Sequence, residues 1–122
     1  MLIGAERDSE TLDRLIGDRD DVAIAAVTAA ELLVGVELAD KRRRERREKY
    51  VADVFRTIPV ESYDLQVARV HASLLAHVRR KGTSGGAHDL LIAATAVACE
   101  RELVSGDVSA FEGLPGVVLR VV

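Results

Sequence analysis

The 122-residue sequence contains no tryptophan, a single cysteine and very few aromatic residues, which make up 3% of the chain. Such a low aromatic content argues against folds that bind single-stranded nucleic acid by stacking its bases on aromatic rings. One cysteine excludes both a disulfide framework and a cysteine-rich zinc site. Because Cys99 lies within an apolar segment, we expect it to be a small buried core residue rather than a nucleophile.

Long apolar runs and an excess of positive charge are also missing. No run approaches the roughly 18 apolar residues of a membrane-spanning helix, and the first residues have neither the basic start nor the apolar centre of a signal peptide. We therefore expect a cytoplasmic protein that does not contact a membrane. The net charge is −3, so any nucleic-acid binding would depend on a local basic patch.

Short apolar segments alternate with helical patterns along the chain, without a linker or a repeat. This alternation predicts one α/β domain with three layers, in which helices flank a central parallel sheet. The length of the chain also suits a single domain. The predicted strands cover residues 22–27, 58–60, 102–105 and 117–122, and the predicted helices cover 9–17, a stretch from about 29, a stretch through 50–55, 64–80 and 88–100.

Three acidic residues are expected at the carboxyl ends of these strands, where open α/β sheets bind their ligands. Glu31 lies early in the helix after residues 22–27, Asp89 opens the apolar helix 88–100, and Asp107 follows the strand 102–105. Clustered carboxylates repel one another unless a cation lies among them, and Mg²⁺ and Mn²⁺ prefer oxygen ligands. A metal ion at such a site activates water and stabilises charge on a phosphoryl group. The pattern is typical of a metal-dependent phosphodiesterase.

Each acid also has a purely structural interpretation. Thr28 and Glu31 have the spacing of a capping box, with Thr28 as the N-cap. Asp89 suits an N-cap or the first turn of a helix, and Asp107 suits a turn. The two interpretations are compatible, because a carboxylate has two oxygens.

Three segments of the sequence resemble the acidic motifs of PIN-domain ribonucleases, and in particular of VapC-type toxins. Residues 28–35 resemble the second motif, residues 86–96 the third, and residues 103–111 followed by 114–117 the fourth motif and the closing strand. The resemblance implies a Mg²⁺- or Mn²⁺-dependent endoribonuclease, the toxin of a type II toxin–antitoxin pair, with RNA as substrate, a VapB-like antitoxin as partner and a homodimeric assembly. It implies that Glu31, Asp89 and Asp107 are the catalytic and metal-binding acids, supported by Ser105 and Thr28.

The beginning of the chain departs from the PIN pattern. Members of the family open with a strand that ends in Asp-Thr-Ser, whereas residues 1–7 resemble the part just after that aspartate. We therefore expect a single PIN-like domain over residues 1–122 that lacks the first strand and the first acid, through a late start codon or a shortened chain. This departure motivates an alternative, a catalytically inactive PIN-like module that engages an antitoxin or RNA without cleavage. A receiver-like domain is disfavoured because no lysine follows Asp107 in the required place.

Two basic segments provide candidate RNA contacts. Residues 41–49 form either a solvated helix face or a surface that contacts phosphate or the antitoxin. Arg79, Arg80 and Lys81 border the glycine-rich loop before Asp89, and this position makes them the better candidates for binding RNA. His88, next to Asp89, is either a helix-end residue or a further contact to the site or to RNA.

Overall fold

The computed structural model describes residues 1–4, 21–83 and 86–121. Its centre is a five-stranded parallel sheet with the strand order β3-β2-β1-β4-β5. This confirms the predicted α/β class. The helix expected over residues 9–17 lies outside the described residues. The strands are β1 (Leu2–Ile3), β2 (Ala23–Ala25), β3 (Val60–Glu61), β4 (Leu103–Ser105) and β5 (Leu119–Val121).

The middle of the sheet is formed by β1, so the expectation that a central strand is missing is wrong. Leu2 lies opposite Ala23 on one side and Leu103 on the other. Leu2 and Ile3 are fully buried, and the backbone N–H of Leu2 donates to the carbonyl of Glu102 at 2.7 Å. Two buried apolar side chains and hydrogen bonds to both neighbours suffice to place this short segment in the gap between β2 and β4.

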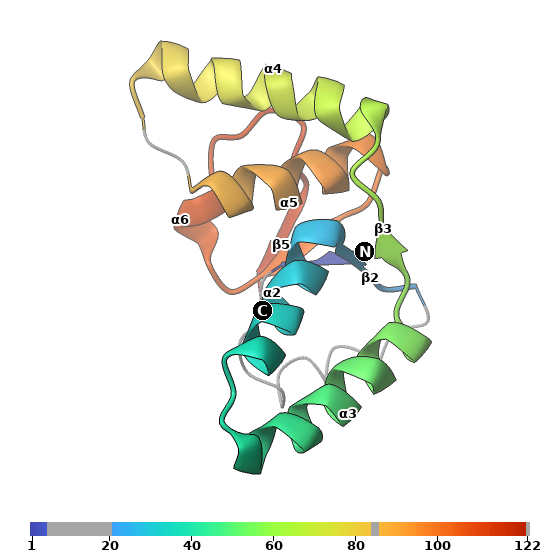
Figure 1. Cartoon of the computed structure of the whole chain (residues 1–122). Helices are drawn as coiled ribbons and strands as arrows, with labels where there is room; N and C mark the ends of the chain where they lie inside the picture. Colours follow the sequence, from blue (N-terminus) through green and yellow to red (C-terminus); the bar gives the residue numbers. More distant parts are fainter. Residues whose placement is uncertain (5–20, 84–85, 122) are drawn as a thin grey trace.

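Helices cover both faces of the sheet and complete the three layers (Figure 1). Successive strand residues point to opposite faces, so Leu2 and Ala23 belong to one core cluster whereas Ile3 and Ile24 belong to the other. The first cluster is closed by α4 and α5, and the second by α2 and α3. The helices are α2 (Ala26–Glu37), α3 (Lys41–Thr57), α4 (Leu65–Lys81), α5 (Ala87–Ala98) and α6 (Val108–Phe111).

Local sequence signals explain several of the helix ends. Asp40 caps α3 by accepting a hydrogen bond from the backbone N–H of Arg43, and Asp64 caps α4 in the same way through Val67. Gly82 ends α4 with a φ of 68°, the left-handed conformation that favours glycine. The charged run of residues 41–49 therefore belongs to α3, which begins well before the predicted stretch through residues 50–55.

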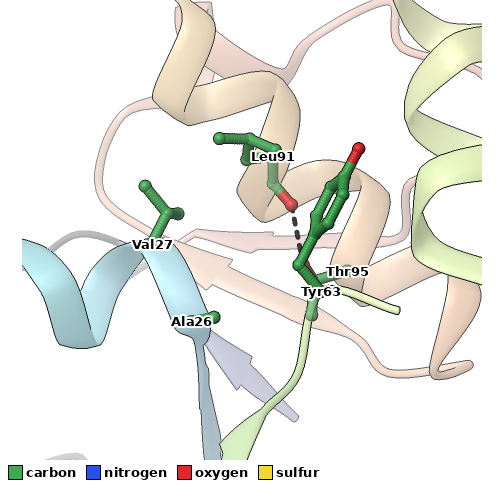
Figure 2. Close-up of a pocket in the computed structure, with 5 residues that line it drawn as sticks. All are labelled: Ala26, Val27, Tyr63, Leu91 and Thr95. Atoms are coloured by element: carbon green, nitrogen blue, oxygen red, sulfur yellow. Dashed lines mark hydrogen bonds between the residues drawn. The ribbon is translucent and has the colours of Figure 1, made fainter. Parts of the chain in front are cut away.

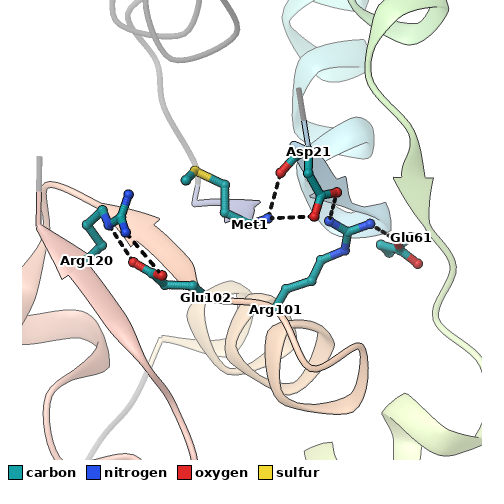
Figure 3. Close-up of polar contacts among 6 residues, drawn as sticks. All are labelled: Met1, Asp21, Glu61, Arg101, Glu102 and Arg120. Atoms are coloured by element: carbon teal, nitrogen blue, oxygen red, sulfur yellow. Dashed lines mark hydrogen bonds and ion pairs between the residues drawn. The ribbon is translucent and has the colours of Figure 1, made fainter. Parts of the chain in front are cut away.

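An ion-pair network joins the segments that precede β2 and β4 (Figure 3). Arg101 donates to Asp21 at 2.8 Å and to Glu61 at 3.1 Å, and the Arg101 side chain is only 19% exposed. Next to β4, Glu102 pairs with Arg120 of β5. Asp21 and Arg101 stand at the amino ends of their strands, so this network holds the sheet at the edge opposite the predicted acids.

Cys99 is the C-cap of α5 and is only partly buried, so the prediction of a fully buried thiol is wrong. Burial, followed by the charge of Glu61, raises the pKa of the Cys99 thiol. The raised pKa disfavours the nucleophilic thiolate. Across the described part of the chain, none of the helices combines the length and apolar character that a membrane crossing requires.

Candidate metal centre

The three predicted acids lie on or beside three different helices, within the first two turns or at the N-cap, at the carboxyl edge of the sheet. Glu31 lies in the second turn of α2, which starts directly after β2. Asp107 is the N-cap of α6 and follows β4 by one residue. Asp89 lies in the first turn of α5, a helix that contacts both α2 and α6. The topology thus brings together acids that are far apart in the sequence.

Burial and the charges of both other acids affect the pKa of Asp89. The pKa is raised, first by burial and then by the negative charges of Asp107 and Glu31, while His88 acts in the opposite direction. Asp89 is therefore close enough to both other acids to be affected by their charges. A raised carboxyl pKa that has burial and two like charges as its causes is a recurrent mark of functional sites.

The acids are nevertheless not gathered into a ready ligand set. Among the residues that the structure describes, no three acidic, histidine or cysteine side chains come together closely enough to hold one metal ion. The Oδ1 atom of Asp107 accepts hydrogen bonds from the Ser109 hydroxyl at 2.8 Å and from the Ala110 N–H at 3.2 Å. The donor chemistry suits Mg²⁺ or Mn²⁺, and binding would require these side chains to turn toward one another.

His88 contacts Glu31 across the interface between α5 and α2. Its Nδ1 atom lies within hydrogen-bond distance of Oε1 of Glu31. The two residues are 57 positions apart in the sequence, so no local pattern could have revealed this pair. The contact occupies Oε1 of Glu31. Among the residues that the structure describes, no hydrogen bond reaches the second carboxylate oxygen, so Glu31 retains an oxygen for a further ligand.

The predicted capping box of Thr28 and Glu31 is not formed. The helix α2 begins at Ala26 with Ala25 as its N-cap, and no side chain caps it. Thr28 is therefore the third residue of the helix and is 6% exposed. Within the described ranges 1–4, 21–83 and 86–121, its buried Oγ1 atom has no hydrogen-bond partner. The sequence signal failed because the strand β2 passes into the helix without a separating turn.

Ser105 supports the loop that carries Asp107. The Ser105 side chain is buried, and its Oγ atom accepts a hydrogen bond from the Asp107 N–H at 3.1 Å. Gly4, directly after β1, packs against the same serine: a Cβ atom at position 4 would lie 3.2 Å from Ser105 Cβ. No acid occurs in residues 1–4, and a side chain at position 4 would press on Ser105.

The candidate RNA-contacting residues lie at the end of α4. Arg79, Arg80 and Lys81 form its last turn and are exposed. In Figure 1 this end of α4 is on the same side of the molecule as the start of α5. Cations in the last turn of a helix are also favoured by the helix dipole, so their presence there has a structural explanation as well.

A small cavity between α2, α5 and the segment after β3 has an apolar lining (Figure 2). It has a volume of about 250 Å³ and is lined by Ala26, Val27, Tyr63, Leu91 and Thr95. The Thr95 hydroxyl is turned away into a hydrogen bond to the Leu91 carbonyl at 2.7 Å. An apolar lining of this kind does not bind phosphate, and none of the three acids contributes to it.

A parallel sheet with acids from α2, α5 and α6 at its carboxyl edge defines the class of the protein. The family model described as the PIN domain matches residues 1–113, and the chain belongs to this family. Within it, the chain is of the VapC type. A curated relative, the tRNA(fMet)-specific endonuclease VapC of Salmonella typhimurium, is 31% identical over 98 residues, which cover 79% of this chain and 71% of the relative.

Solved structures of VapBC complexes share the fold. The DNA-bound VapBC from Salmonella typhimurium matches with a TM-score of 0.85 and 23% identity, over 98% of this chain and 96% of that one. VapBC-5 from Mycobacterium tuberculosis, a member of the VapBC family of toxin–antitoxin systems, matches with a TM-score of 0.77 and 27% identity, over 99% and 97% of the two chains. These similarities confirm the predicted family and fold.

Proposed function

We propose that this chain is an endoribonuclease, the toxin of a type II toxin–antitoxin pair, and that it hydrolyses RNA phosphodiesters with Mg²⁺ or Mn²⁺. The observation that carries the proposal is the electrostatic coupling of Asp89 to Asp107 and Glu31 at the carboxyl edge of the sheet. The endonuclease activity named for the Salmonella relative supports the same reaction class.

Glu31, Asp89 and Asp107 would hold the metal ion, which supplies water activation and charge stabilisation at the phosphate. Burial and the charges of Asp107 and Glu31 all act on the pKa of Asp89, which lies in the first turn of α5. Ser105 fixes the loop of Asp107 through its hydrogen bond to the Asp107 N–H. His88 orients Glu31 from the opposite helix. The repulsion among the three carboxylates would be relieved by the cation, which favours binding.

RNA and a VapB-like antitoxin are the partners that this function requires. Arg79, Arg80 and Lys81, exposed in the last turn of α4, would contact the RNA backbone by charge. His88, whose side chain is 61% exposed, would lie next to the substrate. The VapBC complexes with the same fold support the antitoxin. We also propose that the chain forms a homodimer and acts in the cytoplasm.

A second function is favoured by one observation at the edge of the sheet. The strand β1 ends at Ile3, and residues 1–4 provide no carboxylate beside the other acids. A site with three acids instead of four would bind metal more weakly, because affinity depends on the number of ligands. The alternative is a PIN-like module that binds an antitoxin or RNA without cleaving it.

Cleavage of a structured RNA with and without Mn²⁺ distinguishes the two functions. We expect the wild-type chain to cut only with metal, and Asp89→Asn to be inactive, because the substitution removes a negatively charged ligand. Glu112→Gln, an exposed change just after α6, is the matched control and should cut like the wild type. If the wild type binds RNA but cuts it under no metal condition, the nuclease proposal fails and the binding module takes its place.

A further inference from the structure

The helix α5, which carries Asp89, begins directly after a glycine. Its N-cap is Gly86, and no side chain caps the helix. Gly86 has φ −61° and ψ 134°, a conformation that any L-residue adopts. The backbone therefore does not explain the glycine, although glycine carries an entropic cost on folding. Glycine is common at helix N-caps, and the surroundings of Gly86 give a further reason for the absence of a side chain at this position.

The space where a side chain of residue 86 would lie is filled by the Asp89 carboxylate. A Cβ atom placed on Gly86 would lie 2.7 Å from Oδ2 of Asp89 and 3.4 Å from Cγ, and its three nearest heavy atoms all belong to Asp89. Residues three apart are neighbours on the surface of a helix. The two positions thus compete for one volume, and the carboxylate occupies it only because residue 86 is glycine.

We propose that Gly86 is a positioning residue for Asp89, and that any larger residue at position 86 displaces the Asp89 carboxylate from the acid group. The atom in conflict is the free end of a flexible side chain, so the carboxylate would rotate away while the backbone of α5 stays in place. Gly86→Ala should therefore change the site without unfolding the helix. The consequence for metal binding rests on the proposed function.

Mn²⁺ binding to the purified full chain, measured by titration calorimetry, tests this consequence. We expect Gly86→Ala to weaken the Mn²⁺ affinity by about 10- to 100-fold, the range seen when groups that orient metal ligands are altered, with a nearly unchanged Tm. The matched control is Gly35→Ala in α2, where the new Cβ would meet only the Arg47 guanidinium at an ordinary 3.6 Å. Gly35→Ala should bind Mn²⁺ like the wild type.

A second measurement needs no metal and isolates the contact between the two residues. In an Asp89→Ala background the competing carboxylate is gone, so Gly86→Ala changes the Tm only through the backbone of the N-cap. In the wild-type background the Tm change should differ, because there the new methyl group also displaces the Asp89 carboxylate. An equal Tm change in both backgrounds overturns the proposal, as does wild-type Mn²⁺ affinity in Gly86→Ala.

The two proposals fail in different ways. If the wild type itself binds no Mn²⁺ and cuts no RNA, the proposed nuclease function is wrong. The Tm comparison in the two backgrounds then still decides whether Gly86 positions Asp89: a difference supports the contact, and equality rejects it.

Discussion

At the scale of single residues, the raised pKa of Asp89 has a measurable effect on stability. Burial and the charges of Asp107 and Glu31 make the folded protein bind a proton at Asp89 more tightly than the unfolded chain does. The contribution of Asp89 to the free energy of unfolding therefore falls as the pH rises from the ordinary aspartate value of 3.8 through the raised value, and stays at the lower level above it.

Asp89→Asn removes this titrating group, and we expect it to raise the Tm of the metal-free protein at pH 7 by a few degrees. The difference should shrink below pH 3.8, where Asp89 is protonated in both states. Saturating Mn²⁺ should reverse the order of the two proteins, because only the wild type gains stability from a ligand that binds the native state. Thermal unfolding followed by circular dichroism measures all three effects, and a lower Tm for the metal-free variant at pH 7 would contradict this account.

The unpartnered hydroxyl of Thr28 leads to a second prediction. A buried polar atom without a hydrogen bond costs stability, and valine has the shape of threonine without the hydroxyl. We expect Thr28→Val to stabilise the protein by about 1 kcal/mol in urea unfolding. Thr95→Val is the matched control, because Thr95 is equally buried but donates a hydrogen bond to the Leu91 carbonyl. Thr95→Val should be neutral or destabilising, and a stabilisation of equal size by both changes would exclude the explanation.

At the scale of elements, the short strand β1 contributes more to the stability of the fold than its length suggests. Ile3 is fully buried at the centre of the sheet and belongs to the core cluster under α2 and α3. We expect Ile3→Ala to lower the free energy of unfolding by about 2 to 5 kcal/mol, as for other truncations of buried aliphatic residues. Val118→Ala removes a side chain that is 65% exposed, and should change stability by less than about 0.5 kcal/mol.

Similar effects of Ile3→Ala and Val118→Ala in urea unfolding would mean that β1 is not an integral strand of the sheet. This comparison therefore tests the central position of β1 directly, because both changes remove apolar atoms but only one of them leaves a cavity in the core.

The sequence predicted the longer elements well, since they carry their own periodic patterns and caps. The observed α4 and α5 lie within a residue or two of the predicted 64–80 and 88–100. The start of α2 and the strand β1 were predicted wrongly. A two-residue strand has no periodicity of its own, and it becomes a strand only because β2 and β4 offer backbone partners on both sides.

At the scale of the whole molecule, a net charge of −3 confines RNA binding to local basic surfaces. We expect replacement of Arg79, Arg80 and Lys81 by glutamine to weaken RNA binding and to make it less dependent on salt, by up to about 0.7 in the logarithmic slope for each lost phosphate contact on a single strand. Fluorescence anisotropy in the Asp89→Asn background, at several salt concentrations, measures binding without cleavage.

The α3 helix supplies a control with the same loss of charge. Arg42, Arg43 and Arg46 are exposed on α3, and their replacement by glutamine should leave RNA affinity and its salt dependence nearly unchanged. If the α3 variant loses as much affinity as the α4 variant, or more, the assignment of the RNA surface to the end of α4 is wrong.

The sequence by itself determined the class of fold, the order of the main elements and the three acids, because strand and helix periodicity and the family motifs are local properties of the chain. The tertiary structure decided which groups meet: His88 with Glu31, Ser105 with the Asp107 loop, and the Asp89 carboxylate with the empty space over Gly86. Contacts between elements depend on how the helices pack on the two faces of the sheet, and that packing is fixed by burial across the whole molecule rather than by any single segment.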